Sequence, residues 1–281
     1  MAIAADAHPA TLTLGVRSPA ELTRFYRDVL GLTVHEETSE RVLLGGGVPF
    51  LALEPADPSV TVRPATGLFH VALLYPERAR LADALARLAA ARYPLQGAAD
   101  HGVSEALYLA DPEGNGIELY RDRSRAEWPF QGGALQMVTD PLDVQALLRE
   151  GDADAPPPPT VGIGHMHLRV SDLLAAEEFY VEGVGLERMQ RWRSEASFLA
   201  AGGYHHHLGI NTWSSLGLPQ PHAGAPGLRA WTMQVGAADE LERLAQRLDA
   251  LGWPFARDGE SVQVREPAGS VLQVTTRGPF A

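Results

Sequence analysis

Residues 16–32 read V-R-S-P-A-E-L-T-R-F-Y-R-D-V-L-G-L, and residues 170–186 read V-S-D-L-L-A-A-E-E-F-Y-V-E-G-V-G-L. The two stretches share a leading valine, an F-Y pair and a closing G-L at a constant offset. A second pair of stretches also matches, D-P-E-G-N-G-I-E-L at 111–119 and E-P-A-G-S-V-L-Q-V at 266–274. This internal duplication predicts two copies of one architecture.

The composition is that of a folded protein and sets limits on its partners. The chain has 281 residues, of which 45% are hydrophobic, and a formal net charge of −12. This length suits two domains of ordinary size, and the acidic charge offers no basic footprint for nucleic acid. No apolar run reaches the ~18 residues of a membrane span. Cysteine is absent, which excludes disulfides and thiolate metal sites. The first residues lack the pattern of a secretory signal, so we expect a cytoplasmic location.

Each half of the chain divides again into a strand, a helix and further strands. Pro19 suits a first helical turn, Ser18 suits its cap, and Gly31 suits its end. The D-P-E-G-N-G stretch predicts a tight hairpin. The expected helices cover about 19–30, 77–93 and 238–251, and the expected strands include 11–16, 105–109 and 116–120, with further strands starting near Gly67, Gly164 and Gly227.

The pattern therefore predicts an α+β protein of four β-α-β-β-β units, here called modules one to four. One such module is a short curved sheet with a helix on one face, and it cannot close a core alone. We expect the modules to pair, leaving concave cavities. The expected domains are 8–125 and 161–281, and the segment 126–160, which contains A-D-A-P-P-P-P-T, is expected to be a linker.

Several stretches in this order resemble the vicinal oxygen chelate superfamily, which contains glyoxalase I, extradiol dioxygenases and bleomycin-resistance proteins. The chain is most similar to the small two-domain catechol 2,3-dioxygenase-like proteins of bacteria. The resemblance implies two tandem vicinal-oxygen-chelate domains whose sheets form curved half-barrels. The matching stretches are G-L-F-H-V-A-L-L (67–74), D-H-G-V-S-E-A-L-Y-L-A-D-P-E-G-N-G-I-E-L-Y (100–120), G-H-M-H-L-R-V-S-D-L (164–173) and A-G-G-Y-H-H-H-L-G-I-N-T-W (201–213).

In this superfamily, metal ligands come from the first and last strands of paired modules. Module two has His70 and Glu118 at these positions, and module three has His165. The matching positions of modules one and four hold Thr11, Ala230 and Gln273, so the expected ligand set is His70, Glu118 and His165. Module two would then face module three, and module one would pair with module four. Two histidines and one carboxylate are the ligands of non-haem Fe(II) oxygenases, with Mn(II) as the alternative ion.

The run Tyr204-His205-His206-His207 supplies the expected acid–base catalyst. The resemblance to extradiol enzymes favours His206, with His205 and His207 as the alternatives. If the run is a strand, His206 points to the face opposite its two neighbours. Another interpretation is a histidine-rich strand that binds metal without a catalytic role.

Three further groups of residues are candidates around the same site. In the extradiol family, a histidine and a tyrosine ahead of the glutamate contact the substrate oxygens, and His101 and Tyr108 match these positions. Tyr108 could equally be an ordinary strand aromatic. His167, two residues after His165, is expected to be a pocket wall or a substitute ligand, and His8 an exposed terminal residue. Trp213, Trp231 and Phe198 line an aromatic pocket or fill cores.

The resemblance implies a non-haem Fe(II)-dependent extradiol dioxygenase that cleaves a catechol-like ring, with a small aromatic diol and dioxygen as its substrates. One alternative is a glyoxalase-type metal isomerase or lyase. Another is a metal-free protein of the same fold that binds a small aromatic drug. A homo-oligomer is compatible with the sequence, and neither nucleic acid nor membrane is expected as a partner.

Overall fold

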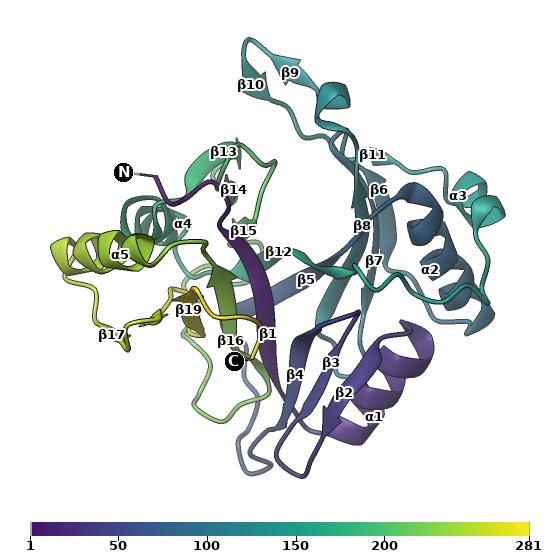
Figure 1. Cartoon of the computed structure of the whole chain (residues 1–281), viewed down its shortest axis with the longest axis horizontal. Coiled ribbons are helices and arrows are strands. Elements are labelled where there is room, and N and C mark those ends of the chain that lie inside the picture. The colour runs from purple at the N-terminus through teal and green to yellow at the C-terminus, as the bar shows by residue number, and fades with distance from the viewer. Residues whose placement is uncertain (1, 281) are drawn as a thin grey trace. The chain divides into compact units, whose positions relative to one another are not determined.

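A computed structural model describes residues 2–280, and it shows an α+β protein with curled sheets, as predicted. The chain divides into two compact parts (Figure 1). Part A consists of Met1–Gly15, Ala56–Phe69 and His165–Ala281. Part B consists of Val16–Pro55 and His70–Gly164. Each part thus contains most of one half of the duplication, except that the first strand of the chain belongs to part A.

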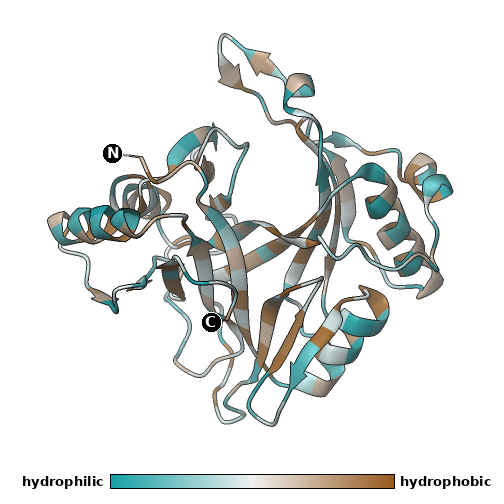
Figure 2. Cartoon of the chain, in the orientation of Figure 1, coloured by the Kyte–Doolittle hydropathy of each residue, from teal (hydrophilic) through white to brown (hydrophobic). Residues whose placement is uncertain are grey.

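Module one in part B is an antiparallel group of strands covered by a short helix. Helix α1 packs on β3 and β4, and Figure 2 shows these two strands as strongly apolar. The elements are α1 (Pro19–Arg24), a π-helical turn (Phe25–Val29), β2 (Thr33–Glu37), β3 (Val42–Gly45) and β4 (Pro49–Pro55), with β3 between β2 and β4.

The ends of this helix test two sequence predictions. Gly31 follows the helix with a φ of 78°, which confirms the predicted stop. Ser18 occupies the N-cap position, as predicted, but its side chain makes no capping hydrogen bond. Instead, the backbone N–H groups of Arg17 and Ser18 donate to the carboxylate of Glu113 in the module-two hairpin. A carboxylate of the next module therefore fixes the backbone that leads into the helix.

Module two supplies the rest of part B. Strand β8 pairs in parallel with β5 and antiparallel with β7, and the order of the strands is β11-β6-β7-β8-β5. The D-P-E-G-N-G stretch forms the predicted turn between β7 and β8. The elements are β5 (Gly67–Tyr75), α2 (Arg78–Ala90), β6 (Gly97–Asp100), β7 (Ser104–Ala110), β8 (Gly116–Asp122), a 3-10 turn (Arg125–Glu127), β9 (Phe130–Gln131), β10 (Ala134–Leu135), β11 (Asp140–Pro141) and α3 (Val144–Glu150). Helix α3, which lies in the segment expected to be a linker, packs on α2.

Part A contains modules three and four together with β1. The strand orders are β17-β18-β19-β16-β1 and β12-β15-β14-β13. Strand β1 pairs antiparallel with β16, opposing Leu12 to Trp231, so a strand of module one joins module four as predicted. The elements are β1 (His8–Val16), β12 (Gly162–Arg169), α4 (Leu173–Glu178), a π-helical turn (Phe179–Val184), β13 (Glu187–Trp192), β14 (Ala196–Ala200), β15 (Leu208–Asn211), β16 (Gly227–Gln234), α5 (Ala238–Ala250), β17 (Phe255–Arg257), β18 (Ser261–Arg265) and β19 (Val271–Thr275).

No helix within residues 2–280 combines the length and the apolar character needed to cross a membrane. The helices are amphipathic instead. In α2, Leu81, Leu85 and Leu88 are buried at helical spacing. Figure 2 shows hydrophilic residues alternating with apolar ones along α2 and α5.

A buried tyrosine–carboxylate hydrogen bond occurs once in each half of the duplication. The Tyr26 hydroxyl donates to Asp111 Oδ2 at 3.0 Å, and the Tyr180 hydroxyl donates to Glu266 Oε2 at 2.7 Å. Each tyrosine lies in the π-helical turn of one module, and each carboxylate opens the last hairpin of the next module. The bond therefore ties two consecutive modules together in each half of the chain.

This arrangement predicts a loss of stability at alkaline pH. Burial, with a further contribution from the neighbouring carboxylate, raises the pKa of Tyr26 and of Tyr180 well above 10, and burial raises the pKa of Tyr75 to about 12. A phenol whose pKa is higher in the folded protein contributes stability that is complete below its unfolded pKa of about 10 and is lost as the pH rises through the folded value. We expect these phenols to ionise only as the protein unfolds, which tyrosinate absorbance and circular dichroism between pH 9 and 12.5 would reveal together.

A Tyr26→Phe variant should show a shallower decline of stability over this range, since it lacks one of the ionising groups. Ionisation of all tyrosines near pH 10 with the circular dichroism spectrum unchanged would contradict this account.

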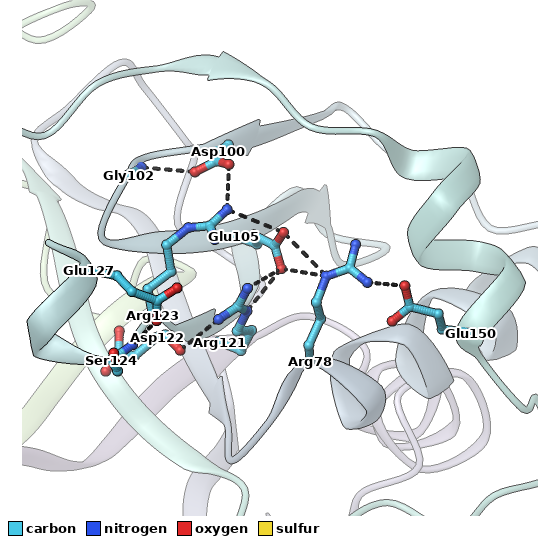
Figure 3. Close-up of polar contacts among 10 residues, drawn as sticks. All are labelled: Arg78, Asp100, Gly102, Glu105, Arg121, Asp122, Arg123, Ser124, Glu127 and Glu150. Atoms are coloured by element: carbon cyan, nitrogen blue, oxygen red, sulfur yellow. Dashed lines mark hydrogen bonds and ion pairs between the residues drawn. The ribbon is translucent and has the colours of Figure 1, made fainter. Parts of the chain in front are cut away.

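A buried carboxylate also attaches both helices of module two to the sheet (Figure 3). Glu105 on β7 is 5% exposed. Its Oε2 accepts from Arg78 Nε at 2.9 Å and from Arg121 Nε at 2.8 Å, and its Oε1 lies 3.4 Å from Arg123 Nη2. Arg78 comes from α2 and also forms an ion pair with Glu150 of α3. One carboxylate therefore links two strands, one helix and, through Arg78, a second helix.

Replacement of Glu105 by glutamine should lower the free energy of unfolding by about 3 kcal/mol, the lower end of the range for breaking a buried ion pair, because the arginines keep partial access to water. Urea denaturation measures this change. The matched control is Glu242→Gln, since Glu242 is exposed and has an ion pair with Arg257 alone, so little change is expected. Equal stability of Glu105→Gln and the wild type would show that Glu105 does not hold the helices.

Candidate functional site

The inner face of module two carries three of the predicted site residues next to one another. Strand β8 opposes Glu118 to Ala72 on β5 and to Tyr108 on β7. His70 Nε2 lies 3.0 Å from Glu118 Oε2, and the rings of His70 and Tyr108 are 5.8 Å apart. His70 and Glu118 are 7% and 3% exposed. The sheet thus places an imidazole, a carboxylate and a phenol together away from bulk water.

His101 extends this cluster through hydrogen bonds. Its Nε2 lies 2.6 Å from the Tyr108 hydroxyl, and its Nδ1 lies 2.6 Å from the carbonyl oxygen of Val138. Because a carbonyl oxygen can only accept, Nδ1 carries a proton and donates a hydrogen bond to the carbonyl oxygen of Val138. Nε2 is therefore the nitrogen that faces Tyr108. The predicted pair of His101 and Tyr108 is brought together here, and the segment after β10 sets the orientation of the imidazole.

Tyr108 is held as a protonated hydrogen-bond donor. Burial, followed by the charge of Glu118 and a hydrogen bond to it, raises the pKa of Tyr108 well above 10. The single phenolic proton can be donated either to Glu118 or to His101 Nε2. A proton at this position can thus be shared between a buried carboxylate and an imidazole.

The inner face of module three carries a cluster of histidines in part A. The ring of His165 on β12 lies 4.1 Å from that of His206 and 6.4 Å from that of His205. His205 and His206 contact each other through their Nδ1 atoms at 2.8 Å. His207 instead accepts a hydrogen bond from the backbone N–H of Ala201. His206 is therefore the member of the run that stacks most closely on His165.

The premise that the histidine run is a strand is wrong. Strand β15 begins only at Leu208, and residues 204–207 form a bend. Gly202 and Gly203 have φ values of 59° and 66°, which glycine adopts readily and which turn the chain before the histidines. Strict alternation holds only for extended backbone. This is why His205 and His206 can touch each other although they are neighbours in sequence.

The remaining predicted residues separate into an aromatic cluster around His167, a core residue and an exposed residue. His167 is buried, and its ring is surrounded by Phe69, Trp213 and Phe198 at centroid distances of 5.0, 5.5 and 5.9 Å. Trp231 is fully buried and belongs to the core. His8 is exposed.

Sequence reasoning missed two residues of module three, Asn211 and Arg169. Asn211 Nδ2 lies 3.0 Å from His167 Nε2, and its Oδ1 accepts from the backbone N–H of Trp213. Arg169 follows His165 and His167 at an alternating position of β12. The pattern H-x-H-x-R in one strand was the available signal, since residues i, i+2 and i+4 share a face.

The chemistry of these donors suits a divalent metal. A carboxylate buried to this degree is costly unless it is paired or binds a cation. Glu118 meets an imidazole nitrogen at 3.0 Å, and both groups are common ligands of Fe(II), Mn(II) and Zn(II). The donor types present therefore fit the predicted ion.

Comparison with known proteins gives the family. The family model of the Glyoxalase/Bleomycin resistance protein/Dioxygenase superfamily matches residues 8–119 and 162–273. The chain belongs to this superfamily. It has two tandem glyoxalase-type domains, one in each matched stretch.

One curated relative covers almost the whole chain. It is the catechol-2,3-dioxygenase of Bacillus subtilis (strain 168), which is 37% identical over 271 residues, or 93% of this chain and 94% of the relative. The aligned region therefore includes both glyoxalase-type domains of this chain.

Solved structures support the fold. A Bacillus subtilis (subsp. subtilis str. 168) protein provisionally described as a dioxygenase matches with a TM-score of 0.67 at 15% identity, covering 100% of this chain and 87% of that one. Glyoxalase I from Zea mays matches with a TM-score of 0.57 at 14% identity, covering 96% and 92%. A protein described as a dioxygenase and a glyoxalase I thus share this fold. The fold alone therefore does not distinguish a dioxygenase from a glyoxalase, and the site residues must do so.

Proposed function

We propose that this protein is a non-haem Fe(II)-dependent extradiol dioxygenase that cleaves the ring of a catechol-like compound. The observation that carries the proposal is the 37% identity to a catechol-2,3-dioxygenase along 93% of the chain. The dioxygenase relationship is supported further by the buried His70–Glu118 contact and the histidine cluster around His165.

The proposed metal ligands are His70, Glu118 and His165. Ferrous iron, when bound, supplies the Lewis acidity that lowers the pKa of a diol hydroxyl and the redox chemistry that dioxygen requires. The last strand of module four, by contrast, offers Gln273, an amide, where module two offers Glu118. Mn(II) would use the same donors, so metal analysis decides which ion is native.

The chain's own residues would handle the protons of the reaction. His206 is proposed to accept a proton from a substrate hydroxyl at an imidazole nitrogen and to return it during ring opening. Tyr108 is proposed to donate its phenolic hydrogen bond to a substrate oxygen, with the ring fixed on β7 opposite Glu118. His101 would hold the Tyr108 hydroxyl through Nε2 while Val138 fixes its tautomer. The aromatic residues around His167 would exclude water from the ring.

The overall proposal is tested by anaerobic purification, reconstitution with Fe(II) or Mn(II), and exposure to a panel of catechols. The expected result is a yellow ring-cleavage product formed with consumption of dioxygen. Isomerisation of a glutathione hemithioacetal without any ring cleavage would favour the glyoxalase-type alternative and overturn the proposal.

The metal ligands can be tested apart from turnover. Glu118→Ala should abolish stoichiometric Fe(II) binding, because the site loses its only charged ligand, whereas Gln273→Ala should leave binding intact. Metal content after dialysis and titration calorimetry measure both variants. Stoichiometric binding by Glu118→Ala would move the metal elsewhere.

The acid–base residue can be tested by separating binding from turnover. His206→Ala should keep the metal and bind substrate but lose turnover by about 10²–10⁴-fold, the usual contribution of general acid–base catalysis. His8→Ala is the matched control, since His8 is exposed and remote in function, and should turn over normally. Normal turnover by His206→Ala would reassign the role to His205 or His207.

A further inference from the structure

One half-buried arginine of module three lacks the carboxylate partner that other half-buried arginines of the chain have. All 23 basic residues are arginines, and Arg78, Arg121 and Arg247 form ion pairs with buried carboxylates. The Nε atom of Arg169 is buried and has no hydrogen-bond partner among residues 2–280. Burial lowers the pKa of Arg169, and no nearby carboxylate offsets this effect. Burying one nitrogen of a guanidinium without a counter-charge is costly, so a ligand that supplies the charge would be favoured.

The position of Arg169 connects it to the proposed active site. His165, His167 and Arg169 alternate along β12 and share one face, while Met166 and Leu168 are fully buried on the other. Successive residues on one face of a strand are about 6.6 Å apart. Arg169 therefore lies about 13 Å along the strand from the proposed ligand His165, where a ring substituent rather than the diol would reach it.

The residue between them is fixed in position. The Oδ1 of Asn211 accepts from the backbone N–H of Trp213, so its Nδ2 donates to His167 Nε2. Nδ1 of His167 is then the protonated nitrogen. The ring lies on Gly209, where an added Cβ would come within 2.8 Å of it. The ring of His167 is thus held in one orientation between His165 and Arg169.

Two aromatic side chains next to the His167 ring are partly exposed to solvent. Phe69 and Trp213 are 37% and 47% exposed, and their rings contact each other at a centroid distance of 5.3 Å. Both also contact the ring of His167. These rings surround His167, which lies two residues before Arg169 on the same face of β12. Aromatic rings suit an aryl group, and a guanidinium further along the strand suits an anion on it.

The duplication shows that this row is particular to module three. The positions in module one that match His165, His167 and Arg169 hold Thr11, Thr13 and Gly15. The guanidinium therefore occurs in the same module as the proposed ligand, and the copy without the ligand lacks it.

We propose that Arg169 binds a carboxylate on the side chain of the aromatic substrate, so that the natural substrate is a carboxylated catechol. This inference rests on the proposed function for the identity of the reacting diol, but the anion site itself requires neither metal nor turnover. A planar guanidinium binds a carboxylate through two parallel hydrogen bonds, which would also set the direction in which the ring enters.

The first experiment uses metal-free protein and two ligands without a diol. Calorimetry should show 3-phenylpropionate binding more tightly than the neutral 3-phenylpropanol. Arg169→Gln should weaken the binding of 3-phenylpropionate by about 10- to 100-fold, the range for a charge-assisted hydrogen bond. The affinity for 3-phenylpropanol should be unchanged. The affinity of Arg169→Lys for 3-phenylpropionate should lie between those of the wild type and Arg169→Gln. Arg257→Gln, which removes an arginine whose ion pair is with the exposed Glu242, should bind like the wild type.

Equal affinity of the acid and the alcohol, or an Arg169→Gln variant that binds the acid like the wild type, would overturn the proposal. Circular dichroism of Arg169→Gln verifies folding, and no loss of folding is expected because the buried Nε has no hydrogen-bond partner among residues 2–280.

The second experiment uses Fe(II)-loaded enzyme. Arg169→Gln should raise the KM for 3-(3,4-dihydroxyphenyl)propionate by a similar factor and leave the KM for unsubstituted catechol unchanged. An equal loss with both substrates would overturn the specificity role. If the wild type cleaves no catechol at all, the proposed function fails, while the metal-free binding experiment still decides the anion site.

Discussion

The burial of carboxylates in the β7–β8 hairpin is the constraint on which the rest of part B depends. Glu105 and Glu118 lie on adjacent strands and are 5% and 3% exposed. On the helix side, Glu105 is surrounded by three guanidinium groups, which neutralise it permanently and attach the helices. On the inner side, Glu118 meets an imidazole and a phenol, which can release or accept protons. One carboxylate is thereby structural, and the other remains available for chemistry.

The duplication shows how a repeated framework can carry a site in only some of its modules. The tyrosine–carboxylate bond that joins consecutive modules is present in both halves, with Asp111 in one and Glu266 in the other. The proposed metal-ligand positions are not repeated in this way. Glu118 becomes Gln273, and His165 corresponds to Thr11. Framework bonds must be present in every copy because each copy has the same helix to attach, whereas a metal needs one set of ligands.

Several features of the structure were out of reach of sequence patterns for identifiable reasons. The helix near 19–30 has the expected bounds, but its second half is a π-helical turn, which leaves the apolar spacing almost unchanged. Ser18 is a good capping residue by type, yet Glu113 of another module takes the backbone N–H groups in front of the helix. The alternation expected for the histidine run holds only for a strand, and the run is not one. Two glycines with positive φ start a bend there instead.

The sequence by itself determined the four modules, the α+β class and the hairpin turns, because these follow from local periodicity and from the comparison of two copies. The candidate site residues came from the resemblance of its motifs to a known family. Only the tertiary structure decided which side chains meet. It brought Tyr108 to His101 and Glu118, turned His206 onto His165 and His207 toward Ala201, and left the Nε atom of Arg169 buried without a hydrogen-bond partner among residues 2–280. Contacts of this kind depend on strand register and on the paths of loops, which are set by packing between segments far apart in the chain and leave little trace in any one of them.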